Sequence, residues 1–276
     1  MFILKGMKKK LSIIIVSFNT RKLTLECVKS IYANSPSFSF EVIVVDNCST
    51  DGSEKIGSKL KPTWKKNFKL IVNTSNLGFA KANNQGIAKA AGKYILLLNS
   101  DTKIKGNTLE SLVSFAKAHK DCGIVGPRLL NPDGSLQASV FNLPTLTRAI
   151  GQYWLGNAGV LDKYAPKGDT PVVVEALVMA GFLITPGALQ RVGKLDERYF
   201  MYFEDIEYCR QVKEVGLLVY YLPSAEIIHY HGESGKRNGN QKQYERLVAS
   251  SKIYHGFLGY YVYSFILWSG QKFLGK

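Results

Sequence analysis

Four short apolar runs alternate with helical patterns over roughly the first hundred residues, and this alternation restricts the fold more than any other feature. The runs are rich in β-branched residues and have no polar face, which is typical of strands covered on both sides in a parallel sheet. Strands are expected over residues 11–18, 40–47, 68–73 and 93–99, and helices over 20–35 and 78–92. This series predicts an α/β fold, with a Rossmann-like, mostly parallel sheet flanked by helices.

The remaining chain shows weaker patterns. We expect helices over 106–120, 187–193 and 203–216, strands over 123–130 and 172–186, and a strand pair around Pro223 over 217–231. Residues 141–171 are rich in Gly, Pro, Tyr and Trp and lack a clear period, so loops that form a pocket rim are expected there.

The composition narrows the class of protein. A chain of 276 residues with 46% hydrophobic residues can form one large domain, or one domain with an appendage. The four cysteines form no C-x-x-C pair, which favours neither a zinc ribbon nor a disulfide framework and indicates a reducing, cytosolic setting. A net charge of +15 calls for an anionic partner, whether nucleic acid, a phosphate-bearing ligand or an acidic membrane surface.

Polar residues follow three of the predicted strands at their carboxyl ends, namely Asp46–Asn47, residues 76–80 and the triplet that ends YILLLNSDT (94–102). Open α/β sheets bind ligands at this edge, and carboxylates there can contact a base or ribose or hold a divalent cation. A single acidic residue after a strand is more often a helix cap. Three such sites in register point instead to a ligand site.

These motifs, with others further along the chain, resemble the inverting, nucleotide-sugar-dependent glycosyltransferases of family 2, which have the GT-A fold, and especially their rhamnosyltransferase-like members. The matching stretches are SIIIVSFN (12–19), VIVVDNCSTDGS (42–53), NLGFAKANNQGI (76–87), YILLLNSDT (94–102), MAGFLITPGALQRVGKLDERYFMYFEDIEYCRQVKEVG (179–216) and IIHYHGES (227–234). The resemblance implies a catalytic domain over residues 1–235, followed over 236–276 by a basic loop and an aromatic helical tail.

The resemblance also implies a site for the donor nucleotide. Asp46 would contact the base, and the residues near it would be Ser17, Asn19 and Ser49. The nucleotide and its diphosphate would be lined by Asn76, Gly78 and Lys81, and Asn99 and Ser100 would belong to the same nucleotide-sugar site. An ammonium group is a good point-charge partner for phosphate, although Lys81 could equally be a solvated lysine of a helix.

A metal site is implied where Asn99, Ser100 and Asp101 take the place of the family's Asp-x-Asp motif, with Asn99 replacing the first carboxylate. Mg²⁺ or Mn²⁺ often uses one or two carboxylates plus substrate phosphates, so Asp101 could suffice. The resemblance adds His229, in preference to His231, as a second ligand, which favours manganese. A histidine on an apolar strand could instead be a structural core residue.

The resemblance further implies that Asp205 is the general base that an inverting transfer needs, with Glu204 orienting the acceptor or the base. Both could instead simply favour a helix N-terminus. Gly181 would lie beside the acceptor, or relieve packing. Lys236 or Arg237, in a Gly-rich segment, could close over the diphosphate.

The tail from residue 253 to residue 271 contains no formally charged residue but four Tyr, two Phe and a Trp. Aromatic residues prefer the headgroup region of a bilayer, so we expect one interfacial helix that brings the protein to a lipid-linked acceptor. Packing of the tail against the catalytic domain or a partner chain is the alternative.

The predicted function is a metal-dependent hexosyltransferase that moves a sugar, by resemblance rhamnose, from a dTDP- or UDP-sugar to a glycan or lipid-linked glycan for cell-surface polysaccharide assembly. It would be cytoplasmic and peripheral on the inner membrane face. A nucleotidyltransferase would ordinarily carry a Gly-rich phosphate loop, which SFNTRK does not offer. A nucleic-acid-binding protein would not place Asp46, Asp101 and Asp205 at its cleft. An inactive binding module would not need Glu204 and Asp205.

Overall fold

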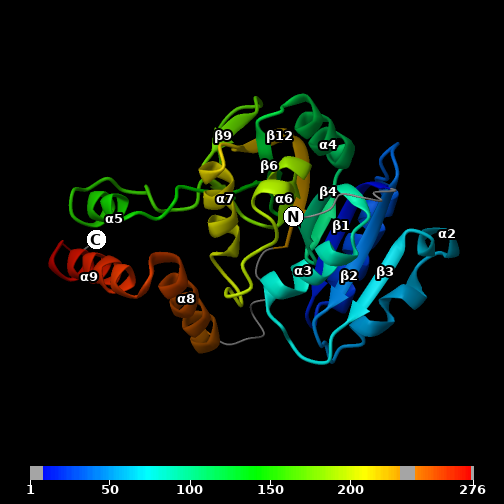
Figure 1. Ribbon diagram of the computed structural model, residues 1–276, viewed down its shortest axis with the longest axis horizontal. Helices are drawn as coiled ribbons and strands as arrows, with labels where there is room; N and C mark the ends of the chain where they lie inside the picture. The colour runs from blue at the N-terminus through cyan, green and yellow to red at the C-terminus, as the bar shows by residue number, and fades with distance from the viewer. Residues whose placement is uncertain (1–8, 231–239, 275–276) are drawn as a thin grey trace.

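The computed structural model describes residues 9–230 and 240–274. Its N-terminal half is a parallel sheet in the order β3-β2-β1-β4 (Figure 1). The strands are β1 (Lys9–Ser17), β2 (Phe40–Asp46), β3 (Phe68–Val72) and β4 (Gly92–Asn99). The connecting helices α1 (Arg21–Ala33) and α3 (Phe79–Lys89) pack on opposite faces, because alternate residues of β1 point to each side. The predicted α/β fold is confirmed in this half.

The second half of the sheet is mixed. Strand β11 (Gly181–Ile184) is antiparallel to both β4 and β6 (Cys122–Leu130), and β12 (Leu218–His229) is parallel to β6. The short strands β5 (Thr102–Ile104), β7 (Leu136–Gln137) and β9 (Val172–Val174) add antiparallel pairs, and β8 (Val140–Phe141) pairs with β10 (Ala176–Leu177). Helices α4 (Thr108–Ala118), α6 (Pro186–Arg191) and α7 (Glu204–Glu214) cover this half.

Two expected elements take a different form, and two short helices join β2 to β3. The strand pair around Pro223 was a wrong prediction, because β12 is one strand whose register against β6 shifts between Leu222 and Glu226, where a proline without an N–H is tolerated. The strand expected over 172–186 is divided among β9, β10 and β11. Between β2 and β3 the chain forms a 3₁₀ helix, η1 (Ser53–Lys59), and the short helix α2 (Pro62–Lys65).

Residues 141–171 are not only loops. Helix α5 (Leu146–Tyr153) lies within them, and the Thr145 hydroxyl caps it by accepting a hydrogen bond from the Arg148 N–H at 3.3 Å. The helix packs against the C-terminal end of the chain, and a contact so distant in sequence leaves no signal in the local pattern of apolar residues.

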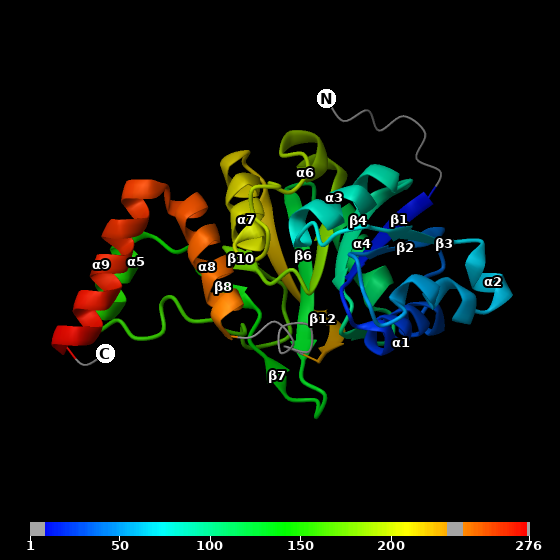
Figure 2. The same cartoon turned by 90° about the horizontal axis from the view of Figure 1, so that it is seen from below.

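The aromatic tail is helical, as predicted, but the expected helix over 253–271 begins later than expected, because residues 253–255 belong to the preceding helix. Helix α8 (Asn240–His255) is followed by Gly256, whose φ of +72° interrupts the helical backbone before α9 (Phe257–Leu274). Helices α9 and α5 lie side by side at the end of the molecule away from β1–β3, as Figures 1 and 2 both show. Within residues 9–230 and 240–274, no helix is both long and apolar enough to cross a membrane.

Candidate active site

Parallel pairing brings the predicted polar residues to one edge of the sheet. Ser17 at the end of β1 is in register with Asp46 at the end of β2, and Val16 is in register with Asn99 at the end of β4. The edge therefore carries the ends of three adjacent strands, as the sequence predicted.

Asp46 is buried in a small cluster of polar groups. Its carboxylate accepts hydrogen bonds from the Ser49 hydroxyl and, at 3.4 Å, from the Ser49 N–H. Burial raises the pKa of Asp46, while the bonds from Ser49 act in the opposite direction. Asn19, which has a φ of +55°, donates its N–H to the Ser49 hydroxyl at 2.9 Å. Three of the predicted donor-site residues are thus brought together.

Ser17 belongs to a different, buried cluster of hydroxyls. Its Oγ lies 2.9 Å from Thr24 Oγ1 and 3.3 Å from Thr20 Oγ1, and Thr20 donates to Ser100 Oγ at 3.0 Å. Through Thr20, Ser17 and Ser100 therefore connect the end of β1 to the residue that follows β4.

Asn47, which the sequence reasoning left out of the donor site, organises the segment after β3. Its Nδ2 donates to Asn76 Oδ1 at 2.9 Å and to the Gly78 carbonyl at 3.2 Å, and its Oδ1 accepts from the Leu77 N–H at 3.0 Å. The Asn76 side chain is therefore engaged in hydrogen bonds within the loop. Gly78 has a φ of +85°, and a Cβ there would lie 2.6 Å from the Phe200 carbonyl oxygen. Lys81 is exposed on the first turn of α3.

Asp101 and His229 are both buried, and they face each other with 3.4 Å between Oδ1 and Nε2. On the other side of the imidazole, Nδ1 lies 2.7 Å from Gln137 Oε1. Because Gln137 Nε2 donates to Asn131 Oδ1 and to the His229 carbonyl, Oε1 is the acceptor and Nδ1 carries the hydrogen. In the neutral form of this tautomer the Nε2 lone pair lies on the side of the carboxylate, which is the arrangement of a metal-ligating histidine.

The donor set at this position is one carboxylate and one imidazole. The part of the chain that the structure describes contains no group of three or more His, Cys, Asp and Glu that could hold a metal. Asn99 is held by its backbone. Its N–H donates a hydrogen bond to the Ala180 carbonyl at 3.0 Å, and its carbonyl accepts one from Thr102 Oγ1 at 2.7 Å. Two further predictions lie outside the described residues, namely His231 as the alternative metal ligand and the closure of Lys236 or Arg237 over the diphosphate.

Glu204 and Asp205 begin α7 immediately after two residues with left-handed backbone, Tyr202 at φ +74° and Phe203 at φ +66°. Such strain in non-glycine residues costs free energy and is concentrated at functional sites. Burial, and then the neighbouring Asp205, raise the pKa of Glu204 to about 8. Burial also raises the pKa of Asp205, against the Ile206 backbone N–H and the positive charge of Lys163.

Asp205 is connected to the end of β4 through the segment before β11. The Met179 backbone hydrogen-bonds to Asp205, and the next residue, Ala180, accepts the Asn99 N–H. Gly181 follows in the core, where a Cβ would lie 2.8 Å from Ile227 Cδ1 and 3.0 Å from Pro127 Cγ. Packing therefore requires this glycine, and its acceptor-binding role remains a prediction.

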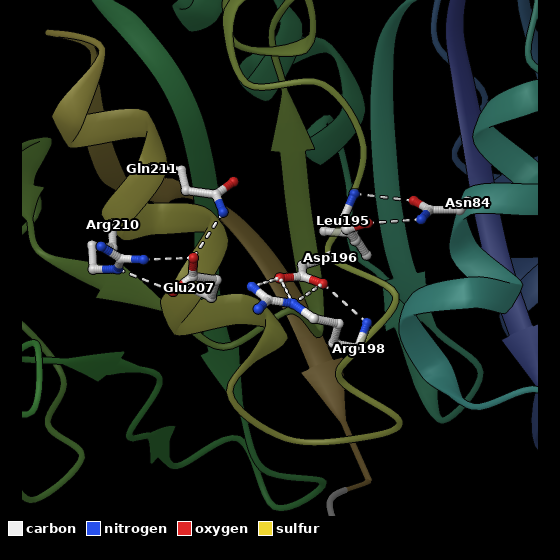
Figure 3. Close-up of polar contacts among 7 residues, drawn as sticks. All are labelled: Asn84, Leu195, Asp196, Arg198, Glu207, Arg210 and Gln211. Carbon is white, nitrogen blue, oxygen red and sulfur yellow. Dashed lines mark hydrogen bonds and ion pairs between the residues drawn. The ribbon is translucent and has the colours of Figure 1, made fainter. Parts of the chain in front are cut away.

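The segment that leads to Glu204 is fixed to α3 (Figure 3). Asn84 exchanges two hydrogen bonds with the Leu195 backbone, at 2.8 and 3.0 Å. Asp196 pairs with Arg198 two residues later, and Glu207 accepts hydrogen bonds from Arg210 and Gln211 on α7. The buried amide contact is the stronger anchor, because Arg198 is largely exposed and surface ion pairs contribute little.

Three residues at the site are absent from the sequence-based assignment. Asn47 carried a signal, since it directly follows Asp46 at the end of a strand. Gln137 and Lys163 carried none, because Gln137 acts by a hydrogen bond to His229 and Lys163 by its charge on Asp205, and both partners lie far along the chain.

The sequence is similar to those of several glycosyltransferases. At 29% identity, the chain matches the N-acetylglucosaminyl-diphospho-decaprenol L-rhamnosyltransferase of Mycobacterium tuberculosis, over 71% of this chain and 68% of that protein. A dTDP-rhamnosyl transferase of Shigella flexneri, RfbF, is 25% identical over 70% of this chain and 60% of its own length.

Two solved structures share the GT-A fold. The structure of GalNAc-T7 with UDP, GalNAc and Mn²⁺ has a TM-score of 0.63 at 17% identity, covering 80% of this chain and 44% of that one. Staphylococcus aureus TarS in complex with UDP has a TM-score of 0.57 at 20% identity, covering 96% and 70%. The family model for glycosyl transferase family 2 matches residues 12–162, more than half of the sequence. The chain therefore belongs to glycosyl transferase family 2.

Proposed function

We propose that this chain transfers one sugar, rhamnose as the first choice, from a nucleoside diphosphate donor to a hydroxyl group of a glycan or lipid-linked glycan. The observation that carries the proposal is the convergence at one end of the sheet of the Asp46 cluster, the Asp101–His229 pair and the Glu204–Asp205 pair. The names of the mycobacterial and Shigella relatives, both rhamnosyl transferases, support the choice of sugar.

The donor nucleotide would bind across the ends of β1 and β2. Asp46 would accept hydrogen bonds from the base, with Ser49 and Asn19 holding the carboxylate in place. Lys81, exposed at the start of α3, would reach the diphosphate. The base would be that of a dTDP- or UDP-sugar, in line with the dTDP in the name of one relative.

Asp101 and His229 would hold a divalent cation, Mn²⁺ or Mg²⁺, because a carboxylate and an imidazole with its Nδ1–H fixed by Gln137 suit such an ion. When bound, the ion would neutralise charge on the leaving diphosphate. The Mn²⁺ in the GalNAc-T7 structure is consistent with this assignment.

Asp205 would be the general base. The acceptor oxygen attacks the anomeric carbon, the bond from that carbon to the diphosphate oxygen breaks, and the hydroxyl proton passes to the Asp205 carboxylate. Glu204, whose pKa is raised to about 8, would keep its proton at neutral pH and spare Asp205 a second adjacent negative charge. Lys163 would favour the ionised form of Asp205.

The acceptor would be lipid-linked and reached from the inner face of the cell membrane. The decaprenol in the name of the mycobacterial relative supports a lipid-linked acceptor, and the net charge of +15 would favour a negatively charged surface.

The test uses purified protein with dTDP-rhamnose or UDP-sugars, with and without Mn²⁺, and measures binding by thermal shift and turnover by release of nucleoside diphosphate. Asp205→Asn should lower kcat by about 10²–10⁴-fold while leaving donor binding intact. Glu214→Gln, at the other end of α7, is the matched control and should behave like the parent.

Release of inorganic pyrophosphate from a nucleoside triphosphate would instead identify a nucleotidyltransferase. Tight, salt-sensitive binding to DNA or RNA without a donor-induced shift would contradict the transferase assignment altogether.

A further inference from the structure

Helices α5 and α9 carry a set of exposed apolar side chains. Six of them are Ile150, Trp154, Leu258, Tyr261, Phe265 and Trp268, and we call this set the α5–α9 surface. Leu258 is 77% exposed, Phe265 62% and Trp268 51%. Apolar patches of this kind mark interaction sites, whereas single exposed apolar residues need no explanation.

The exposed residues of α9 lie on one face of the helix, because positions 258, 261, 265 and 268 recur every three or four residues. The opposite face packs on α5. There a Cβ at Gly270 would lie 2.6 Å from Tyr153 Cβ, and Trp154 Nε1 donates to the Ile266 carbonyl at 3.3 Å. The apolar stripe therefore points away from the molecule, and intramolecular packing does not account for it.

The charged side chains within the two segments that form this surface are all basic, and one of them, Arg148, pairs with Glu175 of a neighbouring segment. Neither residues 141–161 nor residues 246–276 contain an Asp or a Glu. Lys252 Nζ lies 5.3 Å from the centre of the Tyr260 ring near the start of α9, and Lys272 Nζ lies 5.0 Å from that of Trp268 near its end. Lysines beside Trp and Tyr suit an anionic headgroup layer above an apolar interior.

We propose that the α5–α9 surface binds a membrane leaflet rich in anionic lipid, with α9 lying in the plane of the interface. The proposal rests on the proposed function and refines it, because it assigns membrane contact to the paired helices rather than to the tail alone. No described helix is long and apolar enough to cross a membrane, and a helix that lies in the plane of the interface does not need to do so.

Helix α8 connects this surface to the candidate active site. Ser250 Oγ donates to the Met201 carbonyl at 2.8 Å, and the ring of Tyr254 lies 5.3 Å from that of Phe203, centre to centre. Met201 and Phe203 immediately precede Glu204. Binding of the α5–α9 surface to a leaflet thus holds the Glu204–Asp205 pair near the bilayer, where a lipid-linked acceptor presents its sugar.

The experiment is flotation of the full-length protein with phosphatidylcholine vesicles, with and without phosphatidylglycerol. We expect stronger binding to the anionic vesicles and weaker binding as salt rises. Phe265→Asp and Leu258→Asp should each weaken binding about tenfold, as expected when one large apolar side chain no longer leaves water. Val173→Asp, at a similarly exposed position on β9, is the matched control and should bind like the parent.

Lysine variants separate the two contributions. Lys252→Glu combined with Lys272→Glu should reduce binding to anionic vesicles and abolish the preference for them. Equal binding of parent and Phe265→Asp to anionic vesicles would overturn the proposal. So would a dimer in light scattering that Phe265→Asp converts to monomer without any change in vesicle binding, since the surface would then join two copies of the chain.

Donor binding, read by thermal shift, keeps this test distinct from that of the proposed function. Loss of vesicle binding in Phe265→Asp with an unchanged donor-induced shift supports the surface assignment. A parent protein that binds anionic vesicles through this surface but shows no donor-induced shift would count against the transferase assignment alone.

Discussion

At the scale of single residues, the Glu204 carboxyl has unusual surroundings. It is buried beside Asp205, and its Oε2 has no hydrogen-bond partner among the residues that the structure describes. A buried carboxylate without partners is costly, so the group is held in its neutral form and its pKa rises to about 8. The protein is therefore destabilised by the ionisation of this side chain.

The sign of the pH dependence follows from that shift. An unfolded Glu loses its proton near pH ~4.3, whereas folded Glu204 keeps it to about pH 8, so stability is full below the lower value and falls as pH rises between the two. Glu204→Gln should remove most of this fall and be more stable than the parent at pH 8 by roughly 1–3 kcal/mol. Urea unfolding at several pH values measures it, with Glu214→Gln as control. Parallel pH profiles for parent and Glu204→Gln would refute the argument.

Gln137 offers a second test at this scale, because its Oε1 fixes the hydrogen on His229 Nδ1. Gln137→Leu removes the acceptor and should weaken Mn²⁺ binding about 10–100-fold, the usual effect of losing such a partner of a ligating histidine. Calorimetric titration of Mn²⁺ in the presence of dTDP measures the affinity. Gln190→Leu, at an exposed position on α6, should leave it unchanged. An unaltered affinity in Gln137→Leu would argue against His229 as a ligand.

At the scale of elements, the loop before α3 and the segment before α7 are in direct contact. Phe79 donates its N–H to the Phe200 carbonyl at 2.6 Å, and Gly78 leaves room for that approach. Gly78→Ala should separate the two segments, lower stability by about 1–3 kcal/mol and weaken nucleotide binding. Thermal shift with and without dTDP reads both effects.

The matched control is Gly134→Ala. Gly134 has nearly the same φ, +86° against +85°, but a Cβ there meets nothing within 4 Å. This variant carries the backbone strain without the clash and should keep nucleotide binding. If both variants lose stability equally and bind dTDP alike, the contact with Phe200 has no part in the site.

The elements that the sequence predicted are those whose evidence is local. The strands and helices from β1 to β4 follow from apolar runs and helical periods within a few residues. Helix α5 was missed because its order depends on α9, more than a hundred residues away, and β12 was split because Pro223 suggested a break that a register shift accommodates. Non-local packing accounts for both errors.

The residues of the candidate site also fall into those that local sequence evidence predicts and those that it does not. The position of Asp46 and Asp101 at the carboxyl ends of strands was predictable from the alternation of strands and helices alone. The roles of Glu204 and Asp205 came from family resemblance and stay predictions, although their burial and raised pKa values suit them. Gln137 could not be found, since only the folded chain brings β7 to His229.

At the scale of the whole molecule, the chain combines a sheet that carries the candidate site with a helical arm at one end (Figure 2). The expected division into residues 1–235 and 236–276 stays a prediction. Contacts do cross it: α9 packs on α5, and α8 hydrogen-bonds to the segment before α7. The arm is therefore built from both expected parts.

The packing of α9 on α5 can be changed without touching the sheet. At Gly270 a Cβ would lie 2.6 Å from Tyr153 Cβ and 2.7 Å from its carbonyl oxygen, so Gly270→Ala should force the helices apart at a cost of about 1–3 kcal/mol. Hydrogen exchange should then speed up about tenfold or more in α5 and α9 and stay unchanged in β1–β4. Gly259→Ala, in the same helix with only His255 Cβ at 3.5 Å, should leave exchange unchanged or slower. Faster exchange throughout the sheet of Gly270→Ala would mean that the arm and the site unfold as one unit.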